Sequence, residues 1–163
     1  MSTADPQAVM IAHDRWANTL MYESCKALTD EQFRQEFKMG CGSLQNNLVH
    51  NLSAMQAWTD VLNESELRPR LEENRYSAAE LIQLQDRISP EFEAAALKGN
   101  FDDELTPERN GQQYRFTRGG ILTHVMTHSM HHRAQCLNML RQLGIEELPM
   151  SSVVEWMVSE GVQ

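Results

Sequence analysis

The segment Gly119–Leu143 constrains the fold most, because its pattern predicts one long helix with histidines along one side. Four of the chain's six histidines fall between His124 and His132. Residues four apart lie above one another on an α-helix, so His124, His128 and His132 form a ladder. Two imidazoles at this spacing can bind one metal ion, and imidazole suits zinc, copper, iron and nickel. The segment therefore predicts both a helix and a metal site.

The apolar residues of this segment indicate which histidines face inward. On a helical wheel of about 100° per residue, His128 and His132 lie at the edge of the apolar arc. We expect these two to form the inward pair, with His124 as the next candidate and His131 facing solvent or a neighbouring element. Several neutral imidazoles buried together need partners for their polar nitrogens, which favours a metal ion. The residues that form the arc are Ile121, Leu122, Val125, Met126, Leu137, Met139, Leu140 and Leu143.

Three earlier segments also predict long helices, because each begins with a residue that caps helices well. Asp5 and Ser43 are favoured cap residues, and Ser77 with Glu80 matches the capping box. Pro90 lies inside the third of these segments and predicts a kink or a break there. The three helices are expected to run from Pro6 to about Ala27, from Ser43 to about Glu64 and from Ser77 to about Lys98.

The connections and the tail complete the predicted architecture. A loop is expected over Thr29–Gly42, and Asn110-Gly111 predicts a small hairpin or extended crossover within Leu105–Thr117. A short last helix should run from Pro149 to about Glu160. The sequence thus predicts an all-α four-helix bundle with a crossover and a short C-terminal helix, forming a single domain over residues 1–163.

Charge and composition exclude several classes of function. The net charge of −9 opposes binding to nucleic acid or to an anionic membrane surface. No apolar run approaches the roughly 18 residues that a membrane span needs. Between Arg109 and Ile145 there are five arginines and no acidic residue, so the histidine segment is locally electropositive. We expect these arginines to pair with acidic side chains from other helices; holding an anionic substrate is the alternative.

The cysteines and the start of the chain predict where the protein works. Three cysteines, an odd number without a CxxC pair, indicate a reducing, cytoplasmic setting rather than a disulfide framework. The first residues lack a basic region followed by an apolar one, so we expect no secretory signal.

A third metal ligand is needed, because a catalytic zinc site usually has three protein ligands and a water. His50, His13, Cys136 and a carboxylate are all candidates, and the helical wheel does not decide between them. Small residues near His50, such as Ala54, leave room for an ion. Cys136 lies one turn beyond His132 and is expected to serve in packing.

Three motifs, in the same order along the chain, resemble those of the DinB family of metal-dependent, YfiT-like proteins. They are the stretch Arg15-Trp-Ala-Asn18, the segment from Ser43 through His50 to Trp58, and the histidine segment Ile121–Gln135. The resemblance implies an up-down-down-up four-helix bundle, frequently a homodimer. It also implies a zinc or nickel ion bound by His50, His128 and His132. One departure is Ala134, where the family usually has glycine.

The resemblance implies two enzymatic reactions, thiol transfer with a low-molecular-weight thiol as cosubstrate, or hydrolysis. The expected substrate is a small molecule, and no side chain is assigned as the catalytic acid or base beyond a metal-bound water. Asp14 and Tyr22 are unranked candidates for the base. His124 and Arg133 are candidates for supporting the ligands from behind, although bracing the bundle is the favoured role of Arg133.

A second class of function is a non-enzymatic, stress- or damage-inducible metal-binding protein. Access to the ion separates the two classes: an enzyme needs a pocket that leads to the site, whereas a structural site is closed by a fourth protein ligand. Cys136 and His124 are the candidates for that fourth ligand. A ferritin-like di-iron site is disfavoured, because the sequence contains no Glu-x-x-His motif.

Overall fold

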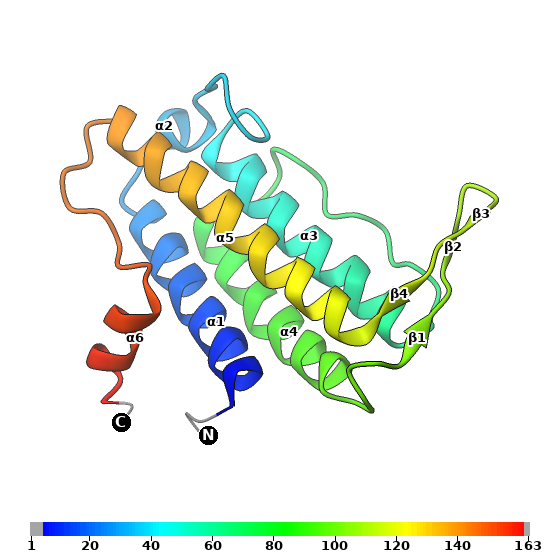
Figure 1. The fold of residues 1–163 in the computed structure, drawn as a ribbon. Helices are drawn as coiled ribbons and strands as arrows, with labels where there is room; N and C mark the ends of the chain where they lie inside the picture. Colours follow the sequence, from blue (N-terminus) through cyan, green and yellow to red (C-terminus); the bar gives the residue numbers. More distant parts are fainter. Residues whose placement is uncertain (1–4, 162–163) are drawn as a thin grey trace.

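The computed structural model describes residues 5–161 and is mostly helical (Figure 1). Four long helices dominate this part of the chain, and four two-residue strands form the connection before the last of them. The long helices are α1 (Pro6–Cys25), α3 (Leu44–Leu62), α4 (Ala78–Ala96) and α5 (Arg118–Gln142). The shorter elements are α2 (Asp30–Arg34), β1 (Glu104–Leu105), β2 (Glu108–Arg109), β3 (Gln112–Gln113), β4 (Phe116–Thr117) and α6 (Val153–Ser159).

The long helices begin where the sequence supplies a cap. Asp5 accepts a hydrogen bond from the backbone of Gln7, and Ser43 accepts one from the backbone of Asn46. Ser77 and Glu80 form the complete capping box that was predicted. These side chains satisfy backbone donors that the first turn of a helix leaves free, which is why the helix starts could be read from the sequence.

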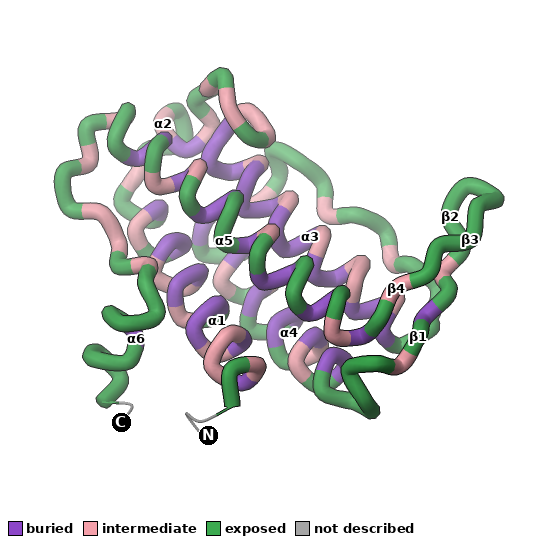
Figure 2. The backbone as a smooth tube through the Cα atoms, viewed as in Figure 1, coloured by how far each residue is buried: buried purple, intermediate pink, exposed green. Residues whose placement is uncertain are grey.

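The four long helices pack side by side around a common core. Helix α1 contacts α4 and α5, and α3 contacts the same two helices. In Figure 1, α1 and α5 run in one direction and α3 and α4 in the other. Figure 2 shows that the buried residues line the inward faces of these helices. Each fully buried aliphatic side chain contributes about 1.5–3 kcal/mol, and Leu44, Leu81, Ile88, Ile121 and Leu140 are among them.

Two local features differ from the sequence-based expectations, and a third excludes one of two predicted alternatives. The predicted loop after α1 contains the one-turn helix α2, which a Thr29–Gln32 capping box starts and the buried side chain of Phe33 anchors. Helix α4 continues through Pro90 without a break, which excludes the break that was predicted as the alternative to a kink. Asp86, whose carbonyl would have paired with residue 90, is an exposed residue. Helix α6 begins after Ser152, which has its own capping box, rather than at Pro149.

The predicted hairpin is present and has two parts. Strand β1 pairs with β4, and β2 pairs with β3 beyond them. Asn110 and Gly111 join β2 to β3, and both have positive φ angles, 54° and 75°. This is the backbone that a tight two-residue hairpin turn requires, and it explains the Asn-Gly pair. The hairpin projects beyond the ends of the helices (Figure 1).

Residues 63–77 connect α3 to α4 by a long stretch without helix or strand. Because these two helices run in the same direction, the connection must travel back along their length. Arg68 fastens it, since its guanidinium binds Asp60 on α3 at 2.8 Å and Glu91 on α4 at 2.7 Å. This connection, called the α3–α4 crossover below, forms one wall of the pocket described next.

Two further findings concern membrane-spanning helices and the cysteines. Within residues 5–161, no helix combines the length and the apolar character that crossing a membrane requires. The three cysteines are free thiols, with Cys25 and Cys136 buried in the core.

A buried ion pair joins α1 to α5. The Arg133 guanidinium donates to the Asp14 carboxylate at 2.9 Å and to the Asn18 side-chain oxygen at 3.0 Å. Its Nε donates to the hydroxyl of Ser151 at 3.1 Å, which ties the segment before α6 to the same network. Both charged side chains are almost completely buried, at 3% and 4% exposure. The bracing role expected for Arg133 matches these contacts.

We predict that Arg133→Met destabilises the protein by about 3–5 kcal/mol, because it leaves the Asp14 carboxylate buried without a partner. Adding Asp14→Leu should restore part of this loss, since the double variant buries no charge. Urea denaturation of the two variants and the parent measures both effects. A loss below about 1 kcal/mol for Arg133→Met would contradict this account of the pair.

Candidate metal centre

The imidazoles of His50, His128 and His132 converge between α3 and α5. One ring nitrogen from each lies within 4.8 Å of the other two. The Nε2 atoms of His50 and His128 are 3.1 Å apart. Two nitrogens bound to one tetrahedral zinc ion at 2.0–2.1 Å would be roughly 3.3 Å apart, so this separation already suits a shared ion. The third ring is equally close, with centroid distances from His132 of 4.7 Å to His50 and 4.5 Å to His128.

The helix register accounts for this convergence. His128 and His132 are four residues apart on α5, so their side chains point the same way from successive turns. His132 is buried and His128 half-buried, whereas His124 and His131 on the same helix are exposed. The burial of each histidine therefore follows its distance from the apolar arc of the helix. His50 is half-buried on α3, which packs directly against α5.

Asn47 orients His132, a role that the sequence analysis did not assign. The Asn47 side-chain oxygen lies 3.0 Å from Nδ1 of His132. The Asn47 amide group donates to the Ser43 carbonyl, which fixes its oxygen toward the histidine. Nδ1 of His132 therefore carries the proton, and Nε2 keeps a lone pair for a ligand bond. The sequence did hold a signal for this role, which is the spacing of Asn47 and His50. Asn47 lies one turn before His50, on the same side of α3.

Gly40 leaves room for the Asn47 side chain that contacts His132. Its φ of +53° belongs to the left-handed region that favours glycine. A Cβ atom at this position would collide with the side-chain oxygens of Asn47 and Gln135. Gly40 therefore lets the loop before α3 pass close to the Asn47 side chain that contacts His132.

The three imidazoles are held in the neutral form that metal binding needs. Burial, followed by the charges of neighbouring histidines, lowers the pKa of His128 to about 4. Burial and the nearby His50 and His131 lower the pKa of His132 to about 4 as well. The pKa of His50 is lowered by burial first and by the positive charge of Arg70 second. At neutral pH each ring therefore offers a lone pair without first losing a proton.

The remaining candidates for a metal ligand lie elsewhere. His13 approaches the carbonyl of Ser151 at 3.0 Å, beside α6. Cys136 is completely buried, and burial raises the pKa of its thiol well above the usual value. His131, which was expected to face solvent or a neighbouring element rather than the metal, is exposed and accepts a hydrogen bond from Gln135. In the part of the chain that the structure describes, the group of close metal-binding side chains has three members.

His124 and Arg133, the candidates for support from behind the ligands, occupy different places. The ring centroid of His124 lies 5.5 Å from that of His128 and 5.2 Å from that of Trp58, so His124 belongs to the wall in front of the site. Arg133 donates its hydrogen bonds to Asp14, Asn18, Ser129 and Ser151 rather than to the three histidines.

Neither unranked candidate for the catalytic base faces the metal centre. Asp14 is bound to Arg133, and Tyr22 is completely buried in the core. Ala134 stands where proteins of the resembling family usually have glycine. It is exposed on α5 and does not affect packing against α3.

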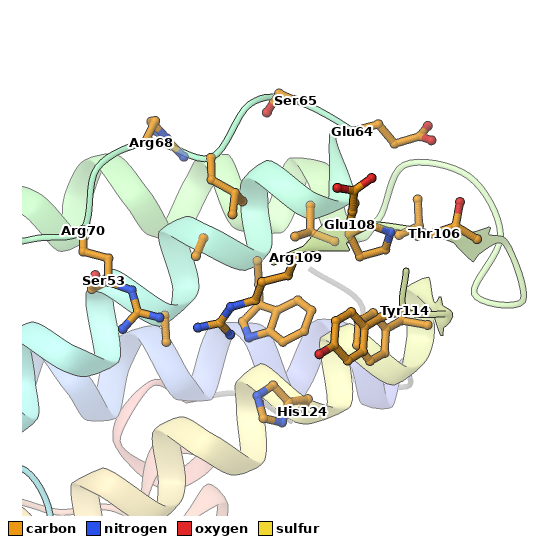
Figure 3. Close-up of a pocket in the computed structure, with 18 of the residues that line it drawn as sticks. Ser53, Glu64, Ser65, Arg68, Arg70, Thr106, Glu108, Arg109, Tyr114 and His124 are labelled. Atoms are coloured by element: carbon orange, nitrogen blue, oxygen red, sulfur yellow. The ribbon is translucent and has the colours of Figure 1, made fainter. Parts of the chain in front are cut away.

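A pocket of about 870 Å³ opens beside the histidines and includes His50 and His128 in its lining. Helices α3 and α5, the α3–α4 crossover and the hairpin form its walls (Figure 3). This volume is in the range of small-molecule sites. One side of the histidine group is thus packed against Asn47 and the loop before α3, while the other opens toward a cavity.

The sequence matches the DinB family model over residues 1–158, so the chain belongs to the DinB family. The fold is similar to the crystal structure of a DinB-like protein, YjoA, from Bacillus subtilis, with a TM-score of 0.63 and 19% sequence identity. This similarity covers 88% of the present chain and 97% of the other. No curated protein matches the sequence. Family membership confirms the resemblance that the three sequence motifs indicated.

We predict that His128→Ala or His132→Ala abolishes stoichiometric metal binding and that His50→Ala weakens it strongly, because each removes one of three converging ligands. Asn47→Ala should weaken metal binding by roughly 10–100-fold, since it frees the His132 ring to rotate. Elemental analysis and metal titration of the purified variants measure these effects. His131→Ala is the matched control and should keep its metal. Full metal occupancy in the His128 variant would contradict the ligand assignment.

We predict that the metal-free protein loses stability as the pH falls from 6.5 toward about 4. The folded chain keeps His128 and His132 neutral down to about pH 4, whereas an unfolded histidine takes up a proton near 6.5. Below pH 6.5 the unfolded state therefore binds more protons, which favours unfolding until the folded pKa is reached. Thermal unfolding of the metal-free protein between these pH values measures the slope. The double variant His128→Gln, His132→Gln should show a shallower slope, and parallel curves would refute the prediction.

Proposed function

We propose that this protein is a metal-dependent enzyme that uses a divalent ion, zinc or nickel, bound by His50, His128 and His132. The observation that carries the proposal is the convergence of three neutral imidazoles at one end of a small-molecule pocket. Imidazole nitrogens are preferred ligands of both metals. The donor set fits such an ion, because three histidines are a common ligand set of catalytic zinc and the pocket beside them would give a small molecule access.

A bound zinc or nickel ion would act as a Lewis acid that lowers the pKa of a coordinated thiol or water. The chain itself supplies orientation, since Asn47 fixes the His132 ring and the packing of α3 on α5 fixes His50. Three neutral ligands leave the charge of the ion uncompensated, which favours an anionic species beside it. Either thiol transfer or hydrolysis is compatible with this arrangement.

For thiol transfer, the proposed reaction joins a low-molecular-weight thiol to an electrophilic small molecule. A sulfur–carbon bond forms, the bond from carbon to the leaving group breaks, and the thiol proton passes to water. The leaving group departs with the electron pair of its bond. Hydrolysis would use water in place of the thiol, with the same balance of bonds and protons.

The alternative is a non-enzymatic metal-binding protein, which requires a closed site. Two observations favour the enzyme: no fourth side chain joins the histidine group within residues 5–161, and the pocket reaches two of the three rings. We also propose the up-down-down-up four-helix bundle, the cytoplasmic setting and the homodimer expected from the sequence. The directions of α1, α3, α4 and α5 support the bundle, and the free cysteines support a reducing compartment.

A paired assay tests the proposal. Protein loaded with zinc or nickel is given chlorodinitrobenzene with cysteine or glutathione, and separately nitrophenyl acetate without thiol. We expect turnover in one of the two assays that a chelator removes and metal restores. His128→Ala should lose this turnover, and His131→Ala should keep it. Full metal occupancy without turnover in either assay would favour the non-enzymatic alternative, and turnover that survives both chelator and His128→Ala would refute the proposed site.

A further inference from the structure

Two arginines with no acidic partner in the described residues face the pocket beside the histidines. Arg70 comes from the α3–α4 crossover and Arg109 from strand β2, and both line the cavity. Figure 3 shows their guanidinium groups pointing toward one another across the pocket. A third lining arginine, Arg68, differs because Asp60 and Glu91 neutralise it. Within residues 5–161, Arg70 and Arg109 form neither an ion pair nor a side-chain hydrogen bond.

The two arginines place positive charge in one pocket of an otherwise acidic chain. The protein carries a net charge of −9 and 23 acidic residues, so partners for surface arginines are plentiful. Glu64 and Glu108 also line the pocket, but Figure 3 shows their carboxylates turned away from the two guanidinium groups. Two like charges that converge near a cluster of histidines repel one another, and a bound anion relieves this repulsion.

Arg70 and Arg109 share the pocket with two of the three histidines. The positive charge of Arg70 is the second cause, after burial, of the lowered pKa of His50. Arg70 and His50 line the same pocket, so one small molecule in the pocket can contact both. The pocket therefore combines two arginines that are unpaired within residues 5–161 with two of the proposed metal ligands.

One part of the pocket wall is aromatic and apolar. The rings of Trp58 and Phe116 meet edge to face at a centroid distance of 5.4 Å, and Tyr114 stacks on Phe116 at 6.1 Å. Ala54 and Ala57 leave space on α3 beside Trp58. A ligand that fits this wall has a flat or apolar body, and a ligand that fits the arginines carries a negative charge.

We propose that the pocket binds a small organic anion with an apolar or aromatic body, and that Arg70 and Arg109 together bind its carboxylate or phosphate group. The guanidinium fork matches either group through paired, charge-assisted hydrogen bonds. The body of the ligand lies against Trp58 and Phe116, next to the histidines. As a statement about the substrate of the enzyme, this inference rests on the proposed function; as a statement about binding, it stands without the metal.

Calorimetric titration of the metal-free protein tests the proposal without involving the metal. The probes are phenylacetate and phenyl phosphate, with neutral phenylacetamide as the matched probe without charge. We expect at least one anion to bind roughly 10–100-fold more tightly than the amide, as charge-assisted hydrogen bonds would give. The anion that binds more tightly identifies the preferred charged group.

Three variants complete the test. Arg70→Gln and Arg109→Gln should each remove most of the preference for the anion, while Arg87→Gln, an exposed arginine of α4 outside the pocket, should keep it. Because the titration uses metal-free protein, failure of the metal proposal and failure of this one give different results. Equal binding of anion and amide, a preference that survives both pocket variants, or no saturable binding of any probe would overturn the proposal.

Discussion

The packing of α3 against α5 is the constraint on which the site depends. Two of the histidines come from successive turns of α5, and any helix with this spacing would place them together. The third comes from α3, and only a fixed register between the helices brings it to 3.1 Å from its neighbour. The same stretch of α3 contributes Asn47, which orients His132 at 3.0 Å. One helix contact therefore sets both the geometry of the ligands and the tautomer of one of them.

The topology of the long helices also builds the pocket. Because α3 and α4 run in the same direction, residues 63–77 must return along them, and this crossover becomes one wall (Figure 1). The hairpin between α4 and α5 supplies the opposite part of the lining, including Arg109 and Phe116. The connections thus carry the groups that would recognise a substrate, while the rigid helices hold the histidines. Such a division is common in enzymes, since connections can change without disturbing the core.

Local sequence signals predicted much of this structure. Cap residues such as Ser43 and Ser77 marked helix starts, Asn110-Gly111 marked the turn, and the apolar arc distinguished His128 and His132 from His131. The short helix α2 was missed, because a single turn has no periodic pattern to detect. His50 was identified by resemblance, and the Asn47 contact was not predicted, since both depend on the register between helices. Of the five arginines expected to pair with acids from other helices, only Arg133 does so in the described part of the chain, with Asp14 on α1. Arg115 and Arg118 pair with Glu104 and Asp103 of the connection between α4 and α5, and Arg109 and Arg141 form no ion pair within the described residues.

The central claim is that three imidazoles from two helices share one divalent ion and leave it open to the pocket. X-ray absorption spectroscopy of natively purified, metal-loaded protein measures this coordination directly. The account predicts three nitrogen ligands at about 2.0–2.1 Å, with scattering typical of imidazole, and a remaining light-atom ligand that an added small anion replaces. A sulfur ligand at about 2.3 Å, or four protein ligands that no added anion displaces, would contradict it.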